Sequence, residues 1–372
     1  MHQQRLLLVR RRGQLLVRRQ QRLLRLRRGG LRRRHRLGHV SPSRRRGEGG
    51  VGLLLNANAG RVKRPLVRAL RKASPDAVIY YTASLEEAQD AIESAIESGL
   101  STLFAGGGDG TIIDLANRLL RYQRAPRLGI LRLGTGNALA TWVGARSPAE
   151  DMKAWTSGEA FREIPMRFVV AEGEAFPFAG MGWDAAVLND YRWAKQYLKG
   201  TPFEAKPYHL PTYLAAAFGR TVPRYTVTQR RPPLVTIEVL EGKGFRIDHT
   251  GHRVGHEMTS GEVLYQGPAH MVAFGSTPYY GYAMKMLPHA TADSSRFHLR
   301  VSALSMSSAI NQLPAIWAGS CQDDQLFDFL VEKVRVSFDQ EVPYQVGGDA
   351  RGMREELTLE LSKLSVPVLS FR

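Results

Sequence analysis

The sequence has 372 residues and a formal net charge of +18, from 52 basic and 34 acidic side chains. Residues 1–50 hold 17 Arg and a single acid, Glu48, whereas the rest of the chain carries 35 basic and 33 acidic side chains. A hydrophobic content of 43% and a single Cys exclude collagen-like, disulfide-stapled and wholly disordered proteins. At about 150 residues per domain, the near-neutral body predicts two domains.

Residues 1–50 form a leader of short Leu, Val and Arg blocks. Like charges at this density repel one another, so we predict that the leader is disordered and builds no core. We favour a plain unstructured extension. The functional alternatives are an electrostatic arm that binds anionic lipid or nucleic acid, and a targeting peptide. The overall charge therefore gives no reason to expect a nucleic-acid partner. No apolar run approaches the roughly 18 residues of a membrane-spanning helix, so we expect a soluble body.

Strand-like and helix-like segments alternate over residues 51–160. Ser84 followed by Glu87 is typical of a capping box at a helix start. The alternation predicts an α/β domain with a parallel sheet and flanking helices, and a ligand site beyond the carboxyl ends of the strands. The predicted strands are 51–55, 77–81, 100–105 and 127–133, and the predicted helices are 64–73, 84–99 and 111–122.

The pattern changes at about Phe161, where short β-branched or alternating runs are separated by Gly and Pro. Such runs predict a second, mainly antiparallel β domain over residues 161–340. Residues 184–222 are an exception, with an aromatic and basic pattern that indicates helix. The predicted strands include 168–171, 234–240, 270–274, 297–301, 333–338 and 357–361.

Three turns of small residues follow three of the predicted parallel strands. They are Asn56-Ala57-Asn58-Ala59-Gly60, Gly106-Gly107-Gly108-Asp109-Gly110-Thr111 and Leu133-Gly134-Thr135-Gly136-Asn137. Consecutive glycines let the backbone approach a phosphate, and a helix start adds positive potential there. A single such turn is more often structural, but three at one sheet edge favour a nucleotide phosphate site. Neither a P-loop nor a convincing dinucleotide fingerprint is present.

The same turns, in this order, resemble the diacylglycerol kinase catalytic domain family, which includes sphingosine kinases and bacterial lipid kinases. The resemblance continues through Gly180-Met181-Gly182-Trp183-Asp184-Ala185, the Gly281–Ala290 segment and Gln345–Gly352, and so covers about residues 51–372. It implies an α/β ATP-binding domain over 51–160 and a β-sandwich-like lipid-substrate domain over 161–340. A C-terminal segment, 341–372, is expected to return to the interdomain cleft.

The resemblance implies which residues contact ATP. Thr82 also fits independently, because it follows the second strand at the same edge of the sheet. In many relatives position 113 is Asn and position 114 is Glu, so Asp114 keeps a carboxylate while Ile113 departs from the pattern. The implied ATP contacts are Asn56, Ala57, Asn58, Ala59, Gly60, Thr82, Gly107, Gly108, Asp109, Gly110, Thr111, Asp114, Gly134, Thr135, Gly136 and Asn137.

Two further departures concern chemistry. The family has Asp-Gly-Glu near the C terminus, with the Glu as proton acceptor, whereas this chain has Gly347-Gly348-Asp349. A general base must come within about 3 Å of the hydroxyl proton or act through a water, so Asp349 would have to reach with a shorter arm. The loop where bacterial relatives place a structural Mg²⁺ reads Asp293-Ser294-Ser295-Arg296, so we expect no metal held there.

Together with the three turns, the resemblance implies an ATP-dependent lipid kinase that phosphorylates the hydroxyl of a diacylglycerol-like or sphingoid-like lipid. Asp349 would accept the proton, and Asp109 would organise the Mg²⁺ that accompanies ATP, or the hydroxyl. A catalytically impaired pseudokinase is one alternative. NAD kinase, which shares the Gly-Gly-Asp-Gly-Thr turn but not the other motifs, is a weaker one. We expect a cytoplasmic protein that meets its lipid peripherally at a membrane surface, and we leave homodimerisation open.

Overall fold

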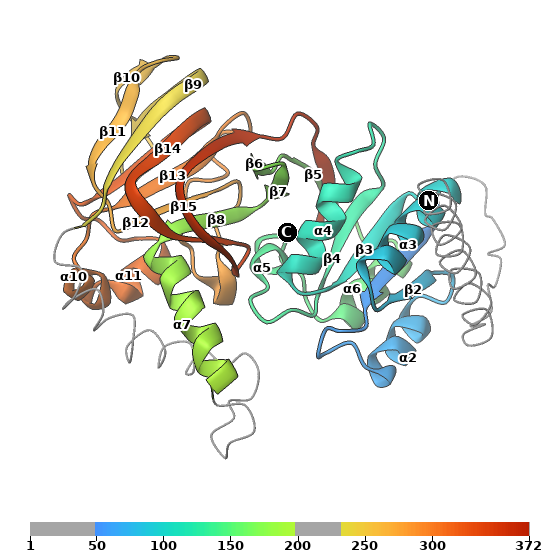
Figure 1. Cartoon of the computed structure of the whole chain (residues 1–372). Coiled ribbons are helices and arrows are strands. Elements are labelled where there is room, and N and C mark those ends of the chain that lie inside the picture. The colour runs from blue at the N-terminus through green and yellow to red at the C-terminus, as the bar shows by residue number, and fades with distance from the viewer. Residues whose placement is uncertain (1–48, 198–231, 372) are drawn as a thin grey trace, which may run out of the picture. The chain divides into compact units, whose positions relative to one another are not determined.

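The computed structural model describes residues 49–197 and 232–371 (Figure 1). The predictions for the leader, apart from its last two residues, and for residues 198–231 lie outside the described residues. Two sheets account for all the strands of the described ranges, one with six strands and one with ten. The sequence-based expectation of an α/β domain with a mostly parallel sheet and a second, mainly antiparallel β domain is confirmed.

The first sheet has the order β2-β1-β3-β4-β16-β5. Its first five strands are parallel, and β5 pairs antiparallel with β16 at the edge. The two strands that follow β4 in the sheet are separated in sequence by some 200 residues, since β16 comes from the end of the chain. The strands are β1 (Val51–Asn56), β2 (Val78–Thr82), β3 (Thr102–Gly107), β4 (Arg127–Arg132), β5 (Arg162–Met166) and β16 (Val366–Ser370).

Helices flank both faces of this sheet (Figure 1). Leu54 packs in a cluster with residues of α3 and α4, whereas its neighbours Leu53 and Leu55 pack with residues of α2 and α6. This alternation follows from the two-residue period of a strand, and it explains why the parallel strands are apolar throughout. The helices are α2 (Arg64–Ala73), α3 (Leu85–Glu97), α4 (Asp109–Leu119), α5 (Ala138–Trp142) and α6 (Pro148–Thr156).

Helix starts in this half are encoded locally. The Ser84 side chain accepts a hydrogen bond from the Glu87 N–H at 3.1 Å, as the capping pattern predicts. The Glu87 carboxylate reaches back to the N–H of Ala83, one residue before the cap, at 2.6 Å. Helix α4 begins at Asp109 with Gly108 as its N-cap, two residues earlier than the apolar spacing predicts. The glycine turn therefore runs directly into a helix.

The ten-stranded sheet is organised by the long strand β14, which pairs with β13, β9, β15 and β8 along its length. Because the first residues of β14 pair with β13 and its last residues pair with β8, β14 closes a ring of strands with β13, β12 and β8. The strands are β6 (Val169–Ala171), β7 (Glu174–Phe176), β8 (Phe178–Gly182), β9 (Leu234–Ile247), β10 (Arg253–Met258), β11 (Val263–Pro268), β12 (Met271–Gly275), β13 (Phe297–Ser302), β14 (Leu326–Val346) and β15 (Asp349–Leu361).

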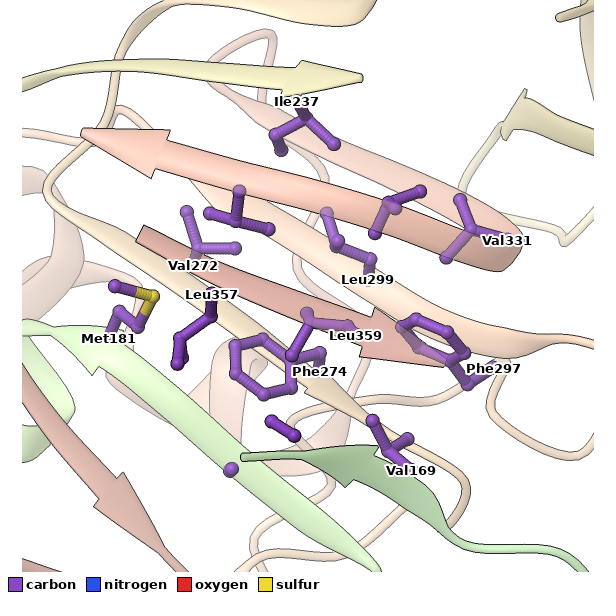
Figure 2. Packing of buried hydrophobic residues seen from close by; sticks show 14 of the residues in the cluster. Val169, Met181, Ile237, Val272, Phe274, Phe297, Leu299, Val331, Leu357 and Leu359 are labelled. Carbon is purple, nitrogen blue, oxygen red and sulfur yellow. The ribbon is translucent and has the colours of Figure 1, made fainter. Parts of the chain in front are cut away.

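Buried Val, Leu, Ile and Phe side chains from these strands share one core (Figure 2). Phe274, Phe297 and Leu359 lie fully buried within it. The remaining elements sit around the sheet: α7 (Trp183–Tyr197), the short 3-10 helix η3 (Gly281–Ala283), α10 (Met306–Asn311) and α11 (Leu313–Ala318). Two features position the site: α7 starts directly after β8, and β14 turns into β15 through Gly347 and Gly348.

Candidate active site

The three small-residue turns meet at one edge of the parallel sheet, because β1, β3 and β4 are neighbours in it. The Asn56 side-chain amide donates to the Thr111 hydroxyl at 2.9 Å, which joins the first turn to the second. A Cβ on Gly134 would lie 2.7 Å from the Gly108 Cα, so the second and third turns touch backbone to backbone. A side chain at Gly134 would therefore force these two turns apart.

Gly108 differs from the glycines around it. Its φ of −85° is available to any residue, and a Cβ there would have only the Gly134 Cα, at 3.9 Å, within contact range. In contrast, a Cβ on Gly107 would lie 2.6 Å from the Thr111 Cβ, and one on Gly136 would lie 2.8 Å from Asp109 Oδ2. Gly107 and Gly136 are therefore required by packing, whereas the lack of a side chain at Gly108 leaves open space.

That space is part of a cavity of about 560 Å³. It is bordered by all three turns and by residues of the ten-stranded sheet and its adjoining loops. Its lining residues are Asn56, Asn58, Ala59, Gly60, Gly108, Asp109, Gly110, Thr111, Leu133, Gly134, Thr135, Gly136, Phe178, Asp184, Leu188, Tyr280, Gly281, Tyr282, Met284, Trp317, Gln345, Gly347, Gly348 and Asp349.

Twelve of the residues predicted from the sequence line this cavity, and five do not. The Thr82 carbonyl accepts from the Ala57 N–H at 2.8 Å, so both residues support the first turn from behind. The buried Asn137 amide donates to the Gly134 carbonyl at 2.7 Å and holds the third turn. Gly107 ends β3. Asp114 forms an ion pair with Arg118 one helical turn further along α4.

Asp109 is nearly buried at the start of α4. Burial and, to a smaller extent, the nearby charge of Asp349 raise the pKa of its carboxyl to about 6, against the lowering effect of hydrogen bonds from the backbone N–H groups of residues 137–139. The Oδ1 atom of Asp109 is buried and has no hydrogen-bond partner among the described residues. An orphaned carboxylate oxygen beside a bare glycine turn is a fitting ligand for a hard cation bound to phosphate.

Asp349 comes from the other sheet. It follows a two-residue hairpin turn in which Gly347 and Gly348 have φ of +57° and +85°, as a tight turn between twisted strands requires. A Cβ on Gly110 would lie 3.5 Å from Asp349 Oδ2, so the carboxylate stands over the first turn of α4. The two predicted catalytic carboxylates are thus brought to one cavity from positions 240 residues apart.

The glycine at position 347 has a specific neighbour. A Cβ at this position would overlap the Ile113 Cδ1 atom, which packs in the core of the ten-stranded sheet. Ile113 and Gly347 are both positions at which the chain departs from the family pattern. The two positions that depart from the family pattern are therefore neighbours in the fold. The Ile113 side chain fills the space that a side chain at position 347 would occupy.

Sequence reasoning missed several lining residues, of which Asp184 carries charge. It lies at the start of α7, and burial raises the pKa of its carboxyl to about 6, against hydrogen bonds from Gln345 and from the backbone. The signal was present in the Gly-x-Gly-x-Asp-Ala motif, since a Cβ on Gly180 would overlap the Asp184 carboxylate. Gln345 was named only as the first residue of the Gln345–Gly352 segment, and no role was predicted for it.

The segment that contains η3 borders another side of the cavity. Tyr282 and Ala283 have φ of +59° and +60°, a left-handed conformation that is uncommon for residues other than glycine. The Tyr282 N–H donates to the Gly136 carbonyl at 2.9 Å, and this bond ties the strained segment to the third turn. Backbone strain of this kind, on the order of 1–3 kcal/mol for each residue, gathers at functional sites.

The loop at Asp293 contains an ion pair. Arg296 pairs with Asp293 and also with Glu332, at 2.8 Å between Nη2 and Oε1. Its guanidinium therefore lies between the two carboxylates. Within residues 49–197 and 232–371, no group of three or more His, Cys, Asp or Glu side chains is arranged to hold a metal ion.

A second cavity, of about 780 Å³, lies beside Asp248, Cys321 and Asp328 and contains none of the predicted site residues. Asp328 accepts hydrogen bonds from His298 at 2.9 Å and from Arg300 at 2.7 Å. Burial would raise the pKa of Asp328, but the neighbouring His298 and Arg300 outweigh it and hold the pKa well below its usual range. We regard this buried triad as structural, because its carboxylate is already paired.

Comparison with known proteins bears on the first of these cavities. Residues 51–164 match the family model described as Diacylglycerol kinase catalytic domain. The resemblance to this family is confirmed. The matched segment contains the three turns and Asp109, whereas Asp184, Gln345 and Asp349 lie beyond it.

The chain is also similar to proteins described as "Probable lipid kinase YegS-like". It is 25% identical to the one from Cronobacter sakazakii over 68% of this chain and 74% of that protein. It is 40% identical to the one from Klebsiella pneumoniae over 28% of this chain and 34% of that protein. The match to the Pseudomonas aeruginosa protein, at 38% identity, spans 22% of this chain and 27% of that protein. Several of these matches thus cover only about a quarter to a third of the relative.

Among solved structures, the chain resembles one titled as a diacylglycerol kinase from Bacillus anthracis, with a TM-score of 0.57. The match covers 86% of this chain and 96% of that one at 18% identity, so it supports the fold alone. None of the helices in the described part of the chain is long and apolar enough to cross a membrane.

Proposed function

We propose that the protein is an ATP-dependent lipid kinase, which transfers the γ-phosphate of Mg–ATP to the hydroxyl of a diacylglycerol-like or sphingoid-like lipid. The observation that carries this proposal is the single cavity bordered by the three phosphate-type turns and by Asp109 and Asp349. The family match over residues 51–164 supports a phosphotransferase. The remaining wall of the cavity, with Phe178, Leu188 and Trp317, suits an apolar substrate.

The three turns would bind the nucleotide. Gly108, Gly134 and Gly136 expose backbone to the cavity, and the N-terminus of α4 adds positive potential where phosphates would lie. Asp109, with its orphaned Oδ1, would hold the magnesium ion that neutralises charge on the transferred phosphoryl group. Residues outside the lining, such as Thr82 and Asn137, would act by holding the turns in shape.

Asp349 would accept the proton from the lipid hydroxyl. Its carboxylate lies over the first turn of α4, which supports this role if the turns bind the phosphate chain and the γ-phosphate points towards α4. The arm of Asp349 is one methylene shorter than that of the family's Glu, so we expect it to act directly at about 3 Å or through one water. Transfer would then depend mainly on positioning and charge neutralisation.

The full chain, incubated with ATP labelled at the γ-phosphate, Mg²⁺ and a mixed lipid extract in micelles, tests the proposal. We expect a labelled lipid product, and none when Asp109→Asn replaces the wild type. Label on NAD offered in the same assay would instead support a NAD kinase. If Mg–ATP raises the melting temperature but no lipid is labelled, the departure at residues 347–349 would favour a pseudokinase that binds without transfer.

We further propose that the enzyme is cytoplasmic and meets its lipid at a membrane surface without spanning the membrane. The apolar wall of the cavity supports the contact with lipid. Co-sedimentation of the protein with vesicles that contain the lipid substrate found in the labelling assay would test the contact with a membrane surface. A protein that stays in the supernatant at low salt would contradict it.

A further inference from the structure

Gln345 is a buried amide whose two ends are both engaged. It lies near the end of β14, with 1% of its surface exposed. Its Nε2 group donates to Asp184 Oδ2 at 2.9 Å, and its Oε1 atom accepts from the Gly348 N–H, also at 2.9 Å. The amide orientation is fixed by chemistry, because the reversed amide would set an oxygen against a carboxylate and a donor against a donor.

The two groups that Gln345 joins belong to different walls of the cavity. Asp184 lies at the start of α7 and lines the cavity. Its Oδ1 atom is buried and has no hydrogen-bond partner within the described ranges. Gly348 belongs to the hairpin turn that precedes Asp349. A single side chain therefore links the carboxylate of α7 to the turn that carries the proposed proton acceptor.

Strand pairing of Val346 with Asp349 flanks the hairpin turn, and two further hydrogen bonds reach the glycines of the turn itself. Gly347 and Gly348 both have positive φ and no side chain, and a Cβ on Gly348 would meet nothing within 4 Å. The Gly347 N–H donates to the Phe178 carbonyl at 3.1 Å, and the Gly348 N–H donates to Gln345. Loss of the second bond would free a two-glycine turn to change its backbone angles, and Asp349 would move with it.

We propose that Gln345 is a positioning residue, which ties the turn that carries Asp349 to Asp184 and holds both carboxylates in a fixed relation at the cavity. The inference rests on the proposed phosphotransfer function. It assigns Gln345 no contact with substrate: its effect on the reaction passes through the placement of Asp349.

Gln345→Glu converts this link into a pH-dependent one. The introduced carboxyl would face Asp184, and two carboxylates at this distance cannot both ionise readily, so they share a proton. With that proton in place, one carboxyl donates to Asp184 and still accepts from the Gly348 N–H, as the amide does. Removal of the proton sets two negative charges against each other and breaks the link.

Other titratable groups around Asp184 are present in both proteins. Asp109 and Asp349 line the same cavity, as do Tyr280 and Tyr282, and His270 stacks on Trp183 with 4.4 Å between ring centroids. Because these groups contribute to wild type and variant alike, the ratio of the two kcat values at each pH isolates the introduced carboxyl.

The test compares kcat and KM for Gln345→Glu and wild type across pH in the lipid phosphorylation assay. We expect the two kcat values to agree within about threefold at pH 6, and the variant to fall about 10²-fold behind by about pH 8.5, as a displacement of about 1 Å at a reacting group can cause. The KM for ATP of the variant should stay within about twofold of the wild-type KM, because the substitution does not change the groups proposed to bind ATP. A kcat ratio that is independent of pH would overturn the proposal.

Gln312→Glu is the matched control. Gln312 also donates to a carboxylate, Asp323 at 2.7 Å, and accepts from a second group, the Cys321 thiol at 2.9 Å, but it does not line the cavity. We expect its kcat ratio to be flat with pH. Gln345→Met, which removes both hydrogen bonds and keeps the volume, should lower kcat at every pH without the added pH dependence.

A readout that needs no activity separates this inference from the proposed function. In ¹⁵N-glycine-labelled protein, the Gly348 amide resonance of the wild type should shift as Asp184 titrates, with a midpoint of about 6. The part of this transition that is lost in Asp184→Asn should also be lost in Gln345→Met, whereas any part that comes from Asp109 should remain in both variants. If wild type phosphorylates no lipid but the transition behaves this way, the proposed function fails and the link stands; if the part lost in Asp184→Asn persists in Gln345→Met, the link is refuted.

Discussion

The contact between Ile113 and Gly347 predicts a coupled pair of substitutions. Gly347→Asp restores the family's residue at 347, but its Cβ would overlap Ile113 Cδ1 in a buried position that is 4% exposed. Overpacking of this kind costs about 1–3 kcal/mol. The left-handed φ of +57° adds about 1 kcal/mol for a residue other than glycine. The stiffer unfolded chain offsets about 0.5–1 kcal/mol, so we expect a net loss of about 1–3.5 kcal/mol.

Ile113→Asn, the family's residue at the other position, should by itself also destabilise by about 2–4 kcal/mol, because it removes a buried apolar side chain and buries an amide. Together the substitutions should cost less than their sum, since the smaller side chain at 113 makes room and can donate to the new carboxylate. We expect a coupling of about 1–3 kcal/mol in urea denaturation of the four proteins.

Gly348→Asp is the matched control for this cycle. A Cβ at Gly348 meets nothing within 4 Å, although its φ of +85° is also left-handed. The control should therefore cost only about 0–0.5 kcal/mol, because about 1 kcal/mol of backbone strain is offset by the stiffer unfolded chain, and it should show no coupling to Ile113→Asn. Free energies of unfolding for Gly347→Asp and Ile113→Asn that add to within about 0.5 kcal/mol would refute the reasoning.

Three further predictions concern the cavity. Gly108→Ala should leave the urea midpoint unchanged and abolish the rise in melting temperature with Mg–ATP, since its Cβ meets only open space and the Gly134 Cα; an unchanged rise would contradict a phosphate role. Asp349→Asn should lower kcat by about 10²–10⁴ with little change in ATP affinity. Asp349→Glu should keep or raise kcat. Glu355→Gln, a control at an exposed position on the same strand, should leave kcat unchanged. An active Asp349→Asn would exclude Asp349 as the base. Finally, burial raises the pKa of Asp109 to about 6, so the native state binds the Asp109 proton more tightly than the unfolded state does. The free energy of unfolding should therefore fall as pH rises from about 4 to 6. Asp109→Asn should therefore be inactive yet about 1–3 kcal/mol more stable than wild type at about pH 7, and the gap should close near pH 4 in thermal unfolding; a gap that does not change with pH would refute the assignment.

The amino-acid sequence determined the α/β half and its three turns. Apolar runs of strand length, the Ser84 cap and the glycines after each strand are local signals, and neighbouring parallel strands necessarily bring their carboxyl ends to one edge. The position of each turn could thus be predicted from the sequence without knowledge of any tertiary contact. The antiparallel strands of the second sheet could be predicted as elements for the same reason, since alternation and turn residues are local.

Only the tertiary structure decided which distant residues complete the cavity. Asp349 lies over α4 because β14 and β15 form a hairpin whose turn packs on Ile113, and Gln345 meets Asp184 because β14 pairs with β8. The last strand, β16, pairs with β4, but the residue types in β16 are compatible with a strand and do not specify its partner. Strand pairing and side-chain contact between segments some 160 to 240 residues apart depend on how the whole chain packs, and no local pattern of residue types encodes them.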